Sequence, residues 1–271
     1  MAILMGFASE LPDITFVAVD TPGSGSNLEY LQAGHADVAL AYSDGVYRAY
    51  AEELRNGARS DAARAIAVLH PAPVHVLVRG DADVRSIADL RGRRIASGAL
   101  GTGTAYTSEV LLRFFGVPNQ PGQVHRLSFE QSVEALRAQQ VDAAFVVSSD
   151  PVDTIRAATD RGAVLVPISG ETLDQLLTDY PFFRRSIIPS LTYPRQPEAV
   201  PTVAVDTLLM CRRQLDDTVV RNLADAFFRI LPDLVGRFPA LRAVDQGRAP
   251  AAPVPLHPGA ALFYREAELA R

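Results

Sequence analysis

The chain has 271 residues, of which 48% are hydrophobic and 21% are charged, as in an ordinary globular protein. A formal net charge of −5 argues against a nucleic-acid-binding protein, because such a protein carries a basic stripe. The single cysteine, Cys211, excludes an internal disulfide and a cysteine-based metal cluster. No apolar run reaches the roughly 18 residues of a membrane span, and the length suffices for two lobes of about 100–150 residues.

The N-terminal part of the chain predicts alternating helices and strands. The β-branched and aromatic run at 14–19 is typical of a strand, and Gly34 is placed to end a helix as its C′ residue. The expected elements are a helix before Pro12, a strand at 14–19, a helix at about 27–33, a strand at 38–42, a helix at about 46–55, and strands at 64–70 and 74–79 separated by Pro71 and Pro73. This alternation predicts a largely parallel sheet covered by helices.

The rest of the chain continues the same alternation. Ser128 is a predicted N-cap, because Phe129, Val133 and Leu136 follow it on one helical face. The expected elements are a strand at 94–97, a helix from the loop 98–104 to Phe115, a strand at 124–127, the helix after Ser128, a strand at 141–147, a helix at about 151–161, a strand at 165–168, an irregular segment at 180–201, a strand at 202–210 and a helix at about 216–235.

One segment of the chain occurs twice. Residues 28–43 (LEYLQAGHADVALAYS) recur without gaps as residues 133–148 (VEALRAQQVDAAFVVS), and each copy predicts a helix end, a polar turn with an Asp, and a strand that stops at a Ser. The identical pairs are Glu29 and Glu134, Leu31 and Leu136, Ala33 and Ala138, Asp37 and Asp142, Ala39 and Ala144, and Ser43 and Ser148. The two copies are 105 residues apart (from residue 28 to residue 133), which exceeds the roughly 20–50 residues of a solenoid unit. It favours two similar α/β lobes with a ligand cleft between them, and the alternative is chance self-similarity of an Ala-rich chain.

We place lobe I at residues 1–79 and 203–271 and lobe II at residues 80–202. Shifted back by the spacing of the repeat, the strand and loop at 94–104 would fall before Met1. Lobe I is therefore expected to lack its first strand and first loop, as in a chain truncated at its N-terminus. The N-terminal residues carry no basic region and no cleavage site, so they do not form a signal peptide.

Two small-residue loops, each between a predicted strand and a predicted helix, are the candidate binding elements. They are Thr21-Pro22-Gly23-Ser24-Gly25-Ser26-Asn27 and Gly101-Thr102-Gly103-Thr104. Helix N-termini present free N–H groups and a partial positive charge, so such loops suit an anion, although simple N-capping by Ser and Thr is the alternative. The repeated strand ends, at 42–44 and 148–150, are expected to face the same cleft, with turn formation as the alternative. The candidate ligand-binding residues are Thr21, Gly23, Ser24, Asn27, Tyr42, Asp44, Tyr47, Thr102, Gly103, Thr104 and Ser148.

The sequence predicts no catalytic residue, no metal site and no cofactor. None of the five histidines is spaced from a carboxylate or another histidine as metal ligands are. The loop at 101–104 lacks the third Gly of a dinucleotide fingerprint, and no Gly-Lys-Ser/Thr follows it. A Gly-x-Ser-x-Gly elbow is also absent, so a hydrolase triad has no anchor.

A series of short motifs occurs along the chain, and their order is more specific than any one of them. They are Thr21-x-Gly23-Ser24-x-x-Asn27-Leu28, Gly34-x-Ala36-Asp37, Ser43-Asp44-x-x-Tyr47-x-Ala49-Tyr50, Asp89-Leu90-x-Gly92-x-Arg94, Gly98-x-x-Gly101-Thr102-Gly103-Thr104, Tyr180-Pro181-Phe182, Ile188-Pro189, Tyr193, Val200-Pro201-Thr202-Val203-Ala204 and Pro255-Leu256-His257-Pro258-Gly259-Ala260. In this order, from about residue 10 to 266, the chain resembles the TAXI family of solute receptors that serve TRAP transporters.

The resemblance implies an α/β, two-lobed type II periplasmic-binding-protein fold, with a hinge and an interlobe cleft. It implies a non-enzymatic receptor that binds a small organic anion, such as glutamate or a dicarboxylate, and delivers it to a TRAP-type membrane permease. The expected location is the periplasm, with the export signal lost by truncation. A ligand-sensing domain of a membrane signalling protein is the alternative that uses the same fold.

Overall fold

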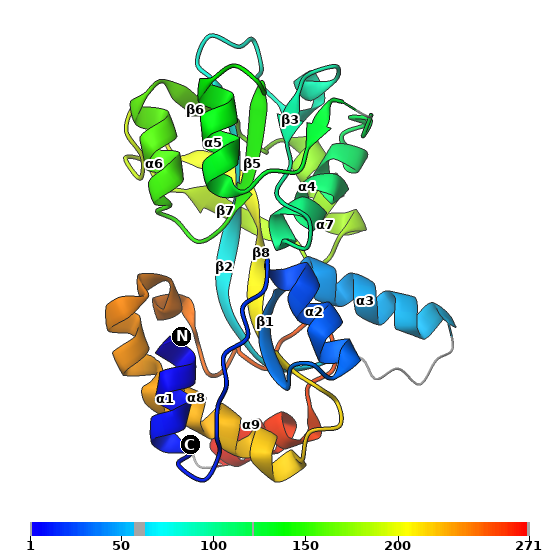
Figure 1. Cartoon of the computed structure of the whole chain (residues 1–271), viewed down its shortest axis with the longest axis vertical. Helices are drawn as coiled ribbons and strands as arrows, with labels where there is room; N and C mark the ends of the chain where they lie inside the picture. The colour runs from blue at the N-terminus through cyan, green and yellow to red at the C-terminus, as the bar shows by residue number, and fades with distance from the viewer. Residues whose placement is uncertain (1, 57–62, 121, 270–271) are drawn as a thin grey trace. The chain divides into compact units, whose positions relative to one another are not determined.

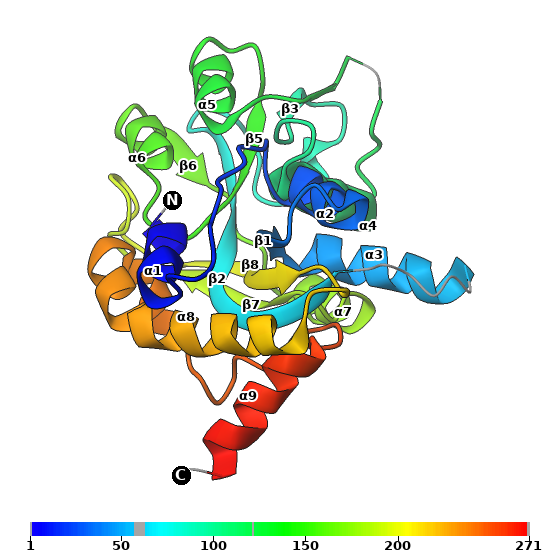
Figure 2. The ribbon, with the colours of Figure 1, turned by 60° about the horizontal axis from the view of Figure 1, so that its bottom comes forward.

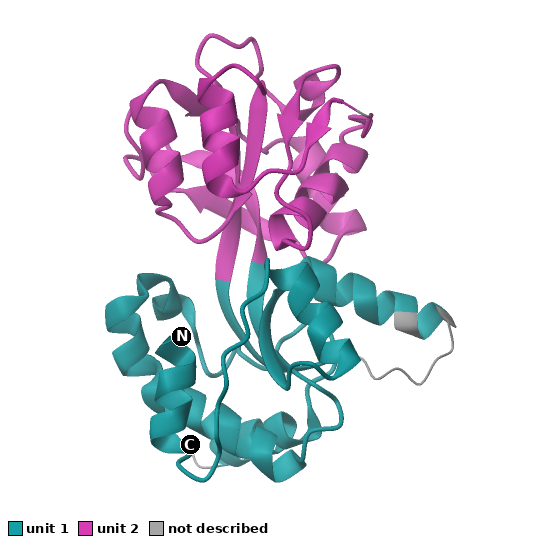
Figure 3. Ribbon diagram, viewed as in Figure 1, with its two compact units in different colours: residues 1–70, 206–271 teal, residues 71–205 magenta. Residues whose placement is uncertain are grey.

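The computed structural model describes residues 2–56, 63–120 and 122–269. The chain divides into two compact units, coloured separately in Figure 3. Unit 1 comprises Met1–His70 and Asp206–Arg271, and unit 2 comprises Pro71–Val205. The chain passes between the units within two long strands, β2 (Arg64–Arg79) and β8 (Val200–Cys211), so each strand belongs to both units (Figures 1 and 3).

Unit 1 is built on the β1–β8 strand pair and three packed helices. Its elements are α1 (Ala2–Glu10), α2 (Ser24–Ala33), β1 (Val38–Tyr42), α3 (Ser43–Asn56), the first part of β2, the last part of β8, α8 (Asp217–Arg237), a 3₁₀ helix (Pro239–Ala243) and α9 (Pro258–Leu269) (Figure 1). Helix α8 packs against α1 and α9, as Figure 2 shows. Phe7, Phe227 and Phe263 from these helices are buried in one apolar core, which stabilises the unit by removing their rings from water.

Unit 2 is a sheet with helices that connect its strands. Its elements are the rest of β2, a 3₁₀ helix (Ile87–Leu90), β3 (Ile95–Ala96), α4 (Gly103–Phe114), β4 (Val124–His125), α5 (Phe129–Arg137), β5 (Ala143–Val147), α6 (Asp153–Asp160), β6 (Ala163–Leu165), α7 (Glu171–Asp179), β7 (Arg184–Ile188) and the first part of β8. Strand β3 lies between β4 and β5 and is parallel to both. The crossovers β3–α4–β4 and β4–α5–β5 run in opposite directions, so the right-handed rule places α4 and α5 on opposite faces of the sheet.

The sequence repeat is also a repeat of backbone structure. Strands β1 and β5 occupy the same positions in their copies, and each is followed by the matching Ser. Gly34 and Gln139, which also match, both adopt positive φ, at 73° and 57°. The next N–H in each copy closes the helix in the same way, from His35 to the Tyr30 oxygen at 2.9 Å and from Gln140 to the Ala135 oxygen at 2.8 Å. This agreement confirms the predicted helix–turn–strand pattern of both copies.

The strand predicted at 14–19 is wrong. These residues form no strand, and Val17 and Val19 are 76% and 51% exposed. By the spacing of the repeat, residues 19–20 correspond to β4, which is a strand because it pairs with β3. The described residues of unit 1 contain no counterpart of β3, so the backbone of this segment has no neighbouring strand to bond. It is instead fixed by Phe16, whose ring stacks on Phe7.

The predicted largely parallel sheet is also wrong. Parallel pairing occurs in β3–β4 and β3–β5, where helical crossovers connect the strands, whereas β1–β8, β2–β5, β2–β6 and β7–β8 are antiparallel. The two runs at 64–70 and 74–79 form the single strand β2, because Pro71 and Pro73 still accept bonds through their carbonyls, from Ser149 Oγ at 3.2 Å and from the Ser148 nitrogen at 3.3 Å.

The segment at 180–201 is not irregular throughout, since it contains β7, which pairs with β8. Alternate residues of β7 are exposed, as expected of a strand with one covered face. The predicted helices before Pro12, over 46–55, after Ser128 and over 216–235 are confirmed, with α2 and α3 each starting three residues earlier than expected. The sequence patterns carried no prediction for α7 or α9.

Candidate functional site

The candidate residues of unit 1 lie at the start of α2. Gly23 is the N-cap of this helix, with φ 150° and ψ −156°, and Ser24 is its first residue. Thr21 donates a hydrogen bond from its hydroxyl to the side-chain oxygen of Asn27, whose amide nitrogen donates to the Leu40 carbonyl at 2.7 Å. Asn27 therefore fastens α2 to β1. Among the described residues, the Ser24 hydroxyl has no hydrogen-bond partner and is available to a ligand.

The other candidates of unit 1 surround the junction of β1 and α3. Asp44 is fully buried in the first turn of α3, where its carboxylate accepts a hydrogen bond from the Gly45 nitrogen at 2.7 Å. A carboxylate is favoured there by the helix dipole. Burial, together with the nearby Asp44 charge, raises the pKa of the Tyr42 hydroxyl well above its ordinary value, so this phenol is neutral. Ser43 accepts a hydrogen bond from the Asp206 nitrogen at 3.0 Å, and Tyr47, one turn along α3, is half-buried.

The candidate residues of unit 2 lie at the start of α4. Thr102 is the N-cap: its hydroxyl oxygen accepts from the Ala105 nitrogen at 3.2 Å and donates to the Ala99 carbonyl at 2.6 Å. Gly103 and Thr104 are the first helical residues, and both are buried. Thr104 Oγ1 accepts from the Val147 nitrogen at 3.1 Å, which fixes the helix start against the end of β5. The first-turn N–H groups have no acceptor within the helix, so the site favours an anion.

The loop before α4 approaches the helix closely, and this approach requires a glycine. Gly98 has φ 89°, and a Cβ there would lie 2.7 Å from the Ala105 nitrogen. Ser148, at the end of β5, is half-buried and donates from its main chain to β2. The structure therefore gathers Thr102, Gly103 and Thr104 at one helix start, with the β5 end tied to the same start through Val147.

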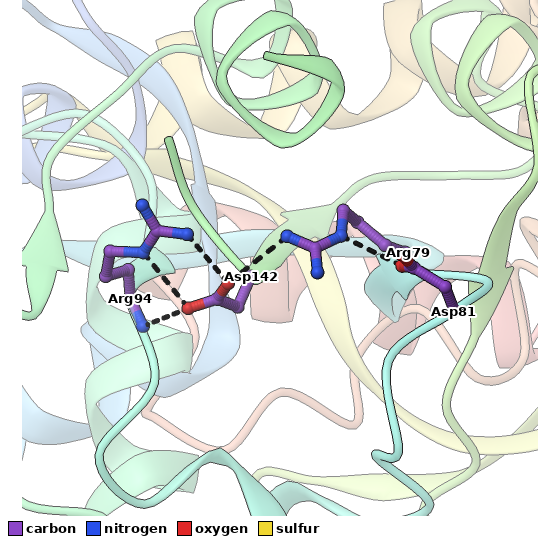
Figure 4. Close-up of polar contacts among 4 residues, drawn as sticks. All are labelled: Arg79, Asp81, Arg94 and Asp142. Carbon is purple, nitrogen blue, oxygen red and sulfur yellow. Dashed lines mark hydrogen bonds and ion pairs between the residues drawn. The ribbon is translucent and has the colours of Figure 1, made fainter. Parts of the chain in front are cut away.

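The aspartates of the repeat have a structural role. Asp142 accepts hydrogen bonds from the main-chain nitrogen and the guanidinium of Arg94, both at 2.9 Å, and Arg79 lies 3.4 Å from it (Figure 4). These Arg94 bonds lower the pKa of Asp142. Arg79 also pairs with Asp81 at 3.0 Å. The matching Asp37 pairs with Arg212, whose nitrogen donates to the Asp37 carbonyl at 3.0 Å. Each aspartate thus ties its turn to an arginine beside a neighbouring strand.

Sequence reasoning missed Arg126, the residue directly after β4. Its guanidinium lies 3.4 Å from the Ala105 carbonyl in the first turn of α4 and 3.8 Å from Glu109. A signal was present, because the spacing of the repeat aligns Arg126 with Thr21, which was already a candidate. The buried pair of His75 and Tyr193, 3.0 Å apart, was missed as well. Its partners come from distant parts of the sequence, so no local pattern connects them.

In the residues that the structure describes, no cluster of three His, Cys, Asp or Glu side chains could hold a metal ion. None of the helices within the described ranges is long and apolar enough to cross a bilayer. Cys211 is buried, and burial raises the pKa of its thiol to about 12. It is therefore an unreactive core residue.

Residues 4–267 match the NMT1-like family. The fold is similar to that of MatC from Rhodopseudomonas palustris with bound malate, at 18% identity over 98% of this chain and 90% of that chain, with a TM-score of 0.59. XAC2383 from Xanthomonas citri bound to ATP is 14% identical over 97% of this chain and 89% of that chain, with a TM-score of 0.58. The alkanesulfonate-binding protein SsuA from Xanthomonas axonopodis pv. citri bound to MOPS is 19% identical over 96% of this chain and 76% of that chain, with a TM-score of 0.51. The chain has the mixed α/β fold of these two-lobed periplasmic binding proteins.

Proposed function

The chain belongs to the NMT1-like family, and from this premise we propose that it is a solute-binding protein that captures a small organic anion. The finer proposal is a TAXI-type receptor, located in the periplasm, that delivers its ligand to a TRAP-type membrane permease. It is a carrier rather than an enzyme. The motif order from Thr21 to Ala260 supports this assignment, and the glutamate or dicarboxylate class of ligand comes from the same resemblance.

The observation that carries the proposal is the start of α4. Gly103 and Thr104, the first residues of α4, present main-chain N–H groups that have no acceptor within the helix, where the helix dipole is positive, and Thr102 caps the helix. The ligands named for the three similar structures are malate, ATP and MOPS, which carry carboxylate, phosphate and sulfonate groups. All three ligands carry an anionic group, so an anionic ligand group at this helix start is consistent with the fold.

We further propose that the loop before α2 contributes to anion binding in unit 1. Ser24 offers its free hydroxyl, while Thr21, Gly23 and Asn27 hold the loop in shape. In this proposal, the residues that set ligand specificity are Tyr42, Asp44, Tyr47 and Ser148.

The proposal is tested by a thermal-shift screen of glutamate, malate, 2-oxoglutarate and succinate, with the corresponding amides, which lack the carboxylates, as controls. A ligand that binds only the native state at about 100 times its Kd stabilises it by roughly 2.7 kcal/mol. We expect at least one carboxylate to raise the melting temperature and its amide to leave it unchanged. If only neutral compounds raise the melting temperature, the anion assignment is wrong.

The site itself is tested by Thr102→Asp. Asp is as good an N-cap as Thr, so the helix is retained although the hydroxyl bond to the Ala99 carbonyl is lost, and the charge of Asp repels an anion at the helix start. Ser128→Asp is the matched control, because Ser128 caps α5 in the same unit and accepts from the Gln131 nitrogen at 3.2 Å. We expect the first variant to lose the ligand-induced shift and the second to keep it. Equal behaviour of the two variants would exclude the start of α4 as the site.

A further inference from the structure

Unit 2 contains a pocket that is separate from the residues assigned to ligand binding above. Its volume is about 420 Å³, which lies in the range of pockets that bind small molecules. The lining residues come from the end of β3, from α4 and the loop after it, and from β4. None of Thr102, Gly103 and Thr104 lines it, although the pocket runs along the same helix.

Two arginines and one glutamate provide the charge of this pocket. Glu109 lies between them, with its carboxylate 2.8 Å from Arg113 and 3.8 Å from Arg126. The three side chains sum to one positive charge, in a chain whose formal net charge is −5. Arg126 is the more sheltered arginine, at 27% side-chain exposure against 69% for Arg113. Its contact with Glu109 is long, and such partly exposed pairs contribute little, so an incoming anion can replace Glu109 at small cost.

A buried hydroxyl also lines the pocket without a partner. Ser97 is 1% exposed, and its hydroxyl makes no hydrogen bond to any described residue. The main chain of Ser97 is fully used, since its nitrogen donates to the His125 carbonyl at 3.0 Å and its carbonyl accepts from Ser108 at 2.7 Å. A buried polar group without a partner costs roughly 1–3 kcal/mol. A ligand oxygen that accepts a bond from this hydroxyl would remove that cost.

The rest of the lining favours a ligand with an apolar body. Leu112 and Val117 lie in the pocket wall at only 2% and 3% exposure, and the accessible apolar surface is that of Val124, which is half-buried, and of Pro118, which is exposed. A purely inorganic anion would leave this apolar surface in contact with water, whereas an aliphatic or aromatic ring would cover it.

We propose that this pocket is a second binding site, for a small monocarboxylate with an apolar body. The carboxylate pairs with Arg126 and accepts a hydrogen bond from Ser97, while the ring lies against Val124 and Pro118. Binding displaces Glu109 from Arg126 and leaves it paired with Arg113. The proposal does not depend on the transport role, because it uses a different set of residues.

The test is isothermal titration calorimetry of the full chain with benzoate, and with benzamide as the neutral probe of the same shape. We expect benzoate to bind and benzamide to bind at least about tenfold more weakly, the equivalent of about 1.4 kcal/mol. Glu109→Gln removes the competing carboxylate and is expected to tighten benzoate binding several-fold. Arg126→Gln is expected to weaken it by about tenfold or more.

The controls separate this site from the start of α4 and from general loss of charge. Arg137→Gln removes an arginine of α5 that pairs with Glu134 outside the pocket, and it should leave benzoate binding unchanged. Thr102→Asp acts on the other site and should also leave it unchanged. Absence of benzoate binding at millimolar concentration, equal affinity for benzamide, or weaker binding by Glu109→Gln would overturn the proposal. Loss of benzoate binding in Thr102→Asp would also overturn it, by placing benzoate at the helix start.

Discussion

The two aspartates of the repeat, Asp37 and Asp142, occupy matching sequence positions. Substituting each one tests how strongly the tertiary structure determines its contribution to stability. We predict that Asp142→Asn destabilises the protein much more than Asp37→Asn. Asp142 has 13% of its side chain exposed and contacts two arginines, whereas Asp37 is 64% exposed and pairs with one. Both substitutions keep the shape of the side chain, remove its charge and replace one acceptor oxygen with a donor NH2 group.

The magnitudes follow from the contacts. Asp142 accepts bonds at 2.9 Å from the Arg94 nitrogen and at 2.9 and 3.2 Å from its guanidinium, with Arg79 at 3.4 Å. A hydrogen bond to a charged group contributes about 1.5–3 kcal/mol, so Asp142→Asn should cost at least about 2 kcal/mol. An exposed ion pair contributes about 0–1 kcal/mol, which bounds the cost of Asp37→Asn.

The assay is urea unfolding followed by far-UV circular dichroism, with each resolvable transition fitted separately because two units can unfold independently. The lowered pKa of Asp142 adds a pH signature. Its ionised form is favoured in the folded state, so its stabilisation is present above the ordinary pKa of 3.8 and is lost as the pH falls below it. Asp142→Asn should remove that dependence. Equal costs for the two variants, or an unchanged acid dependence, would refute the reasoning.

Two further predictions concern unit 2. Burial lowers the pKa of His75 from 6.5 to about 4, so protonation favours the unfolded state, and stability should fall by about 3 kcal/mol as the pH drops from 6.5 to 4. His75→Gln should flatten that part of the stability–pH curve, and an unchanged curve would contradict the neutral assignment. Gly98→Ala should cost roughly 1–3 kcal/mol more than Gly92→Ala, because both positions have positive φ but only a Cβ at Gly98 meets the α4 backbone. Circular dichroism melts measure both variants, and equal melting temperatures would show that the loop can move away from α4.

The sequence was most informative where structure depends on neighbouring residues. The C′ position of Gly34, the N-cap Ser128 and the strand at 38–42 all follow from local backbone chemistry, and the structure confirms them. The repeat extended this local information, because two copies of one pattern predict the same turn. The structure extends the match to the positive φ after α5, where the residue is Gln139 rather than Gly.

The candidate site was predictable only in part. The helix starts were located from their loops, but whether a hydroxyl there is free depends on contacts that come from elsewhere in the chain. Ser24 has no partner among the described residues, whereas Asn27 is bonded to Thr21 and Leu40. Arg126 reaches α4 from a strand that precedes α5, and its role is visible only when the two elements are packed together.

The sequence by itself determined the α/β class, most of the helices, the repeated helix–turn–strand unit and the two small-residue loops, because these depend on periodicity, capping and turn chemistry within a few residues. The tertiary structure decided which apolar runs become strands and how they pair. The run at 14–19 has strand composition but no neighbouring strand in the described part of unit 1, while β2 continues through two prolines because its carbonyls find donors in unit 2. A strand exists only when another strand bonds to it, and that partner is set by the fold.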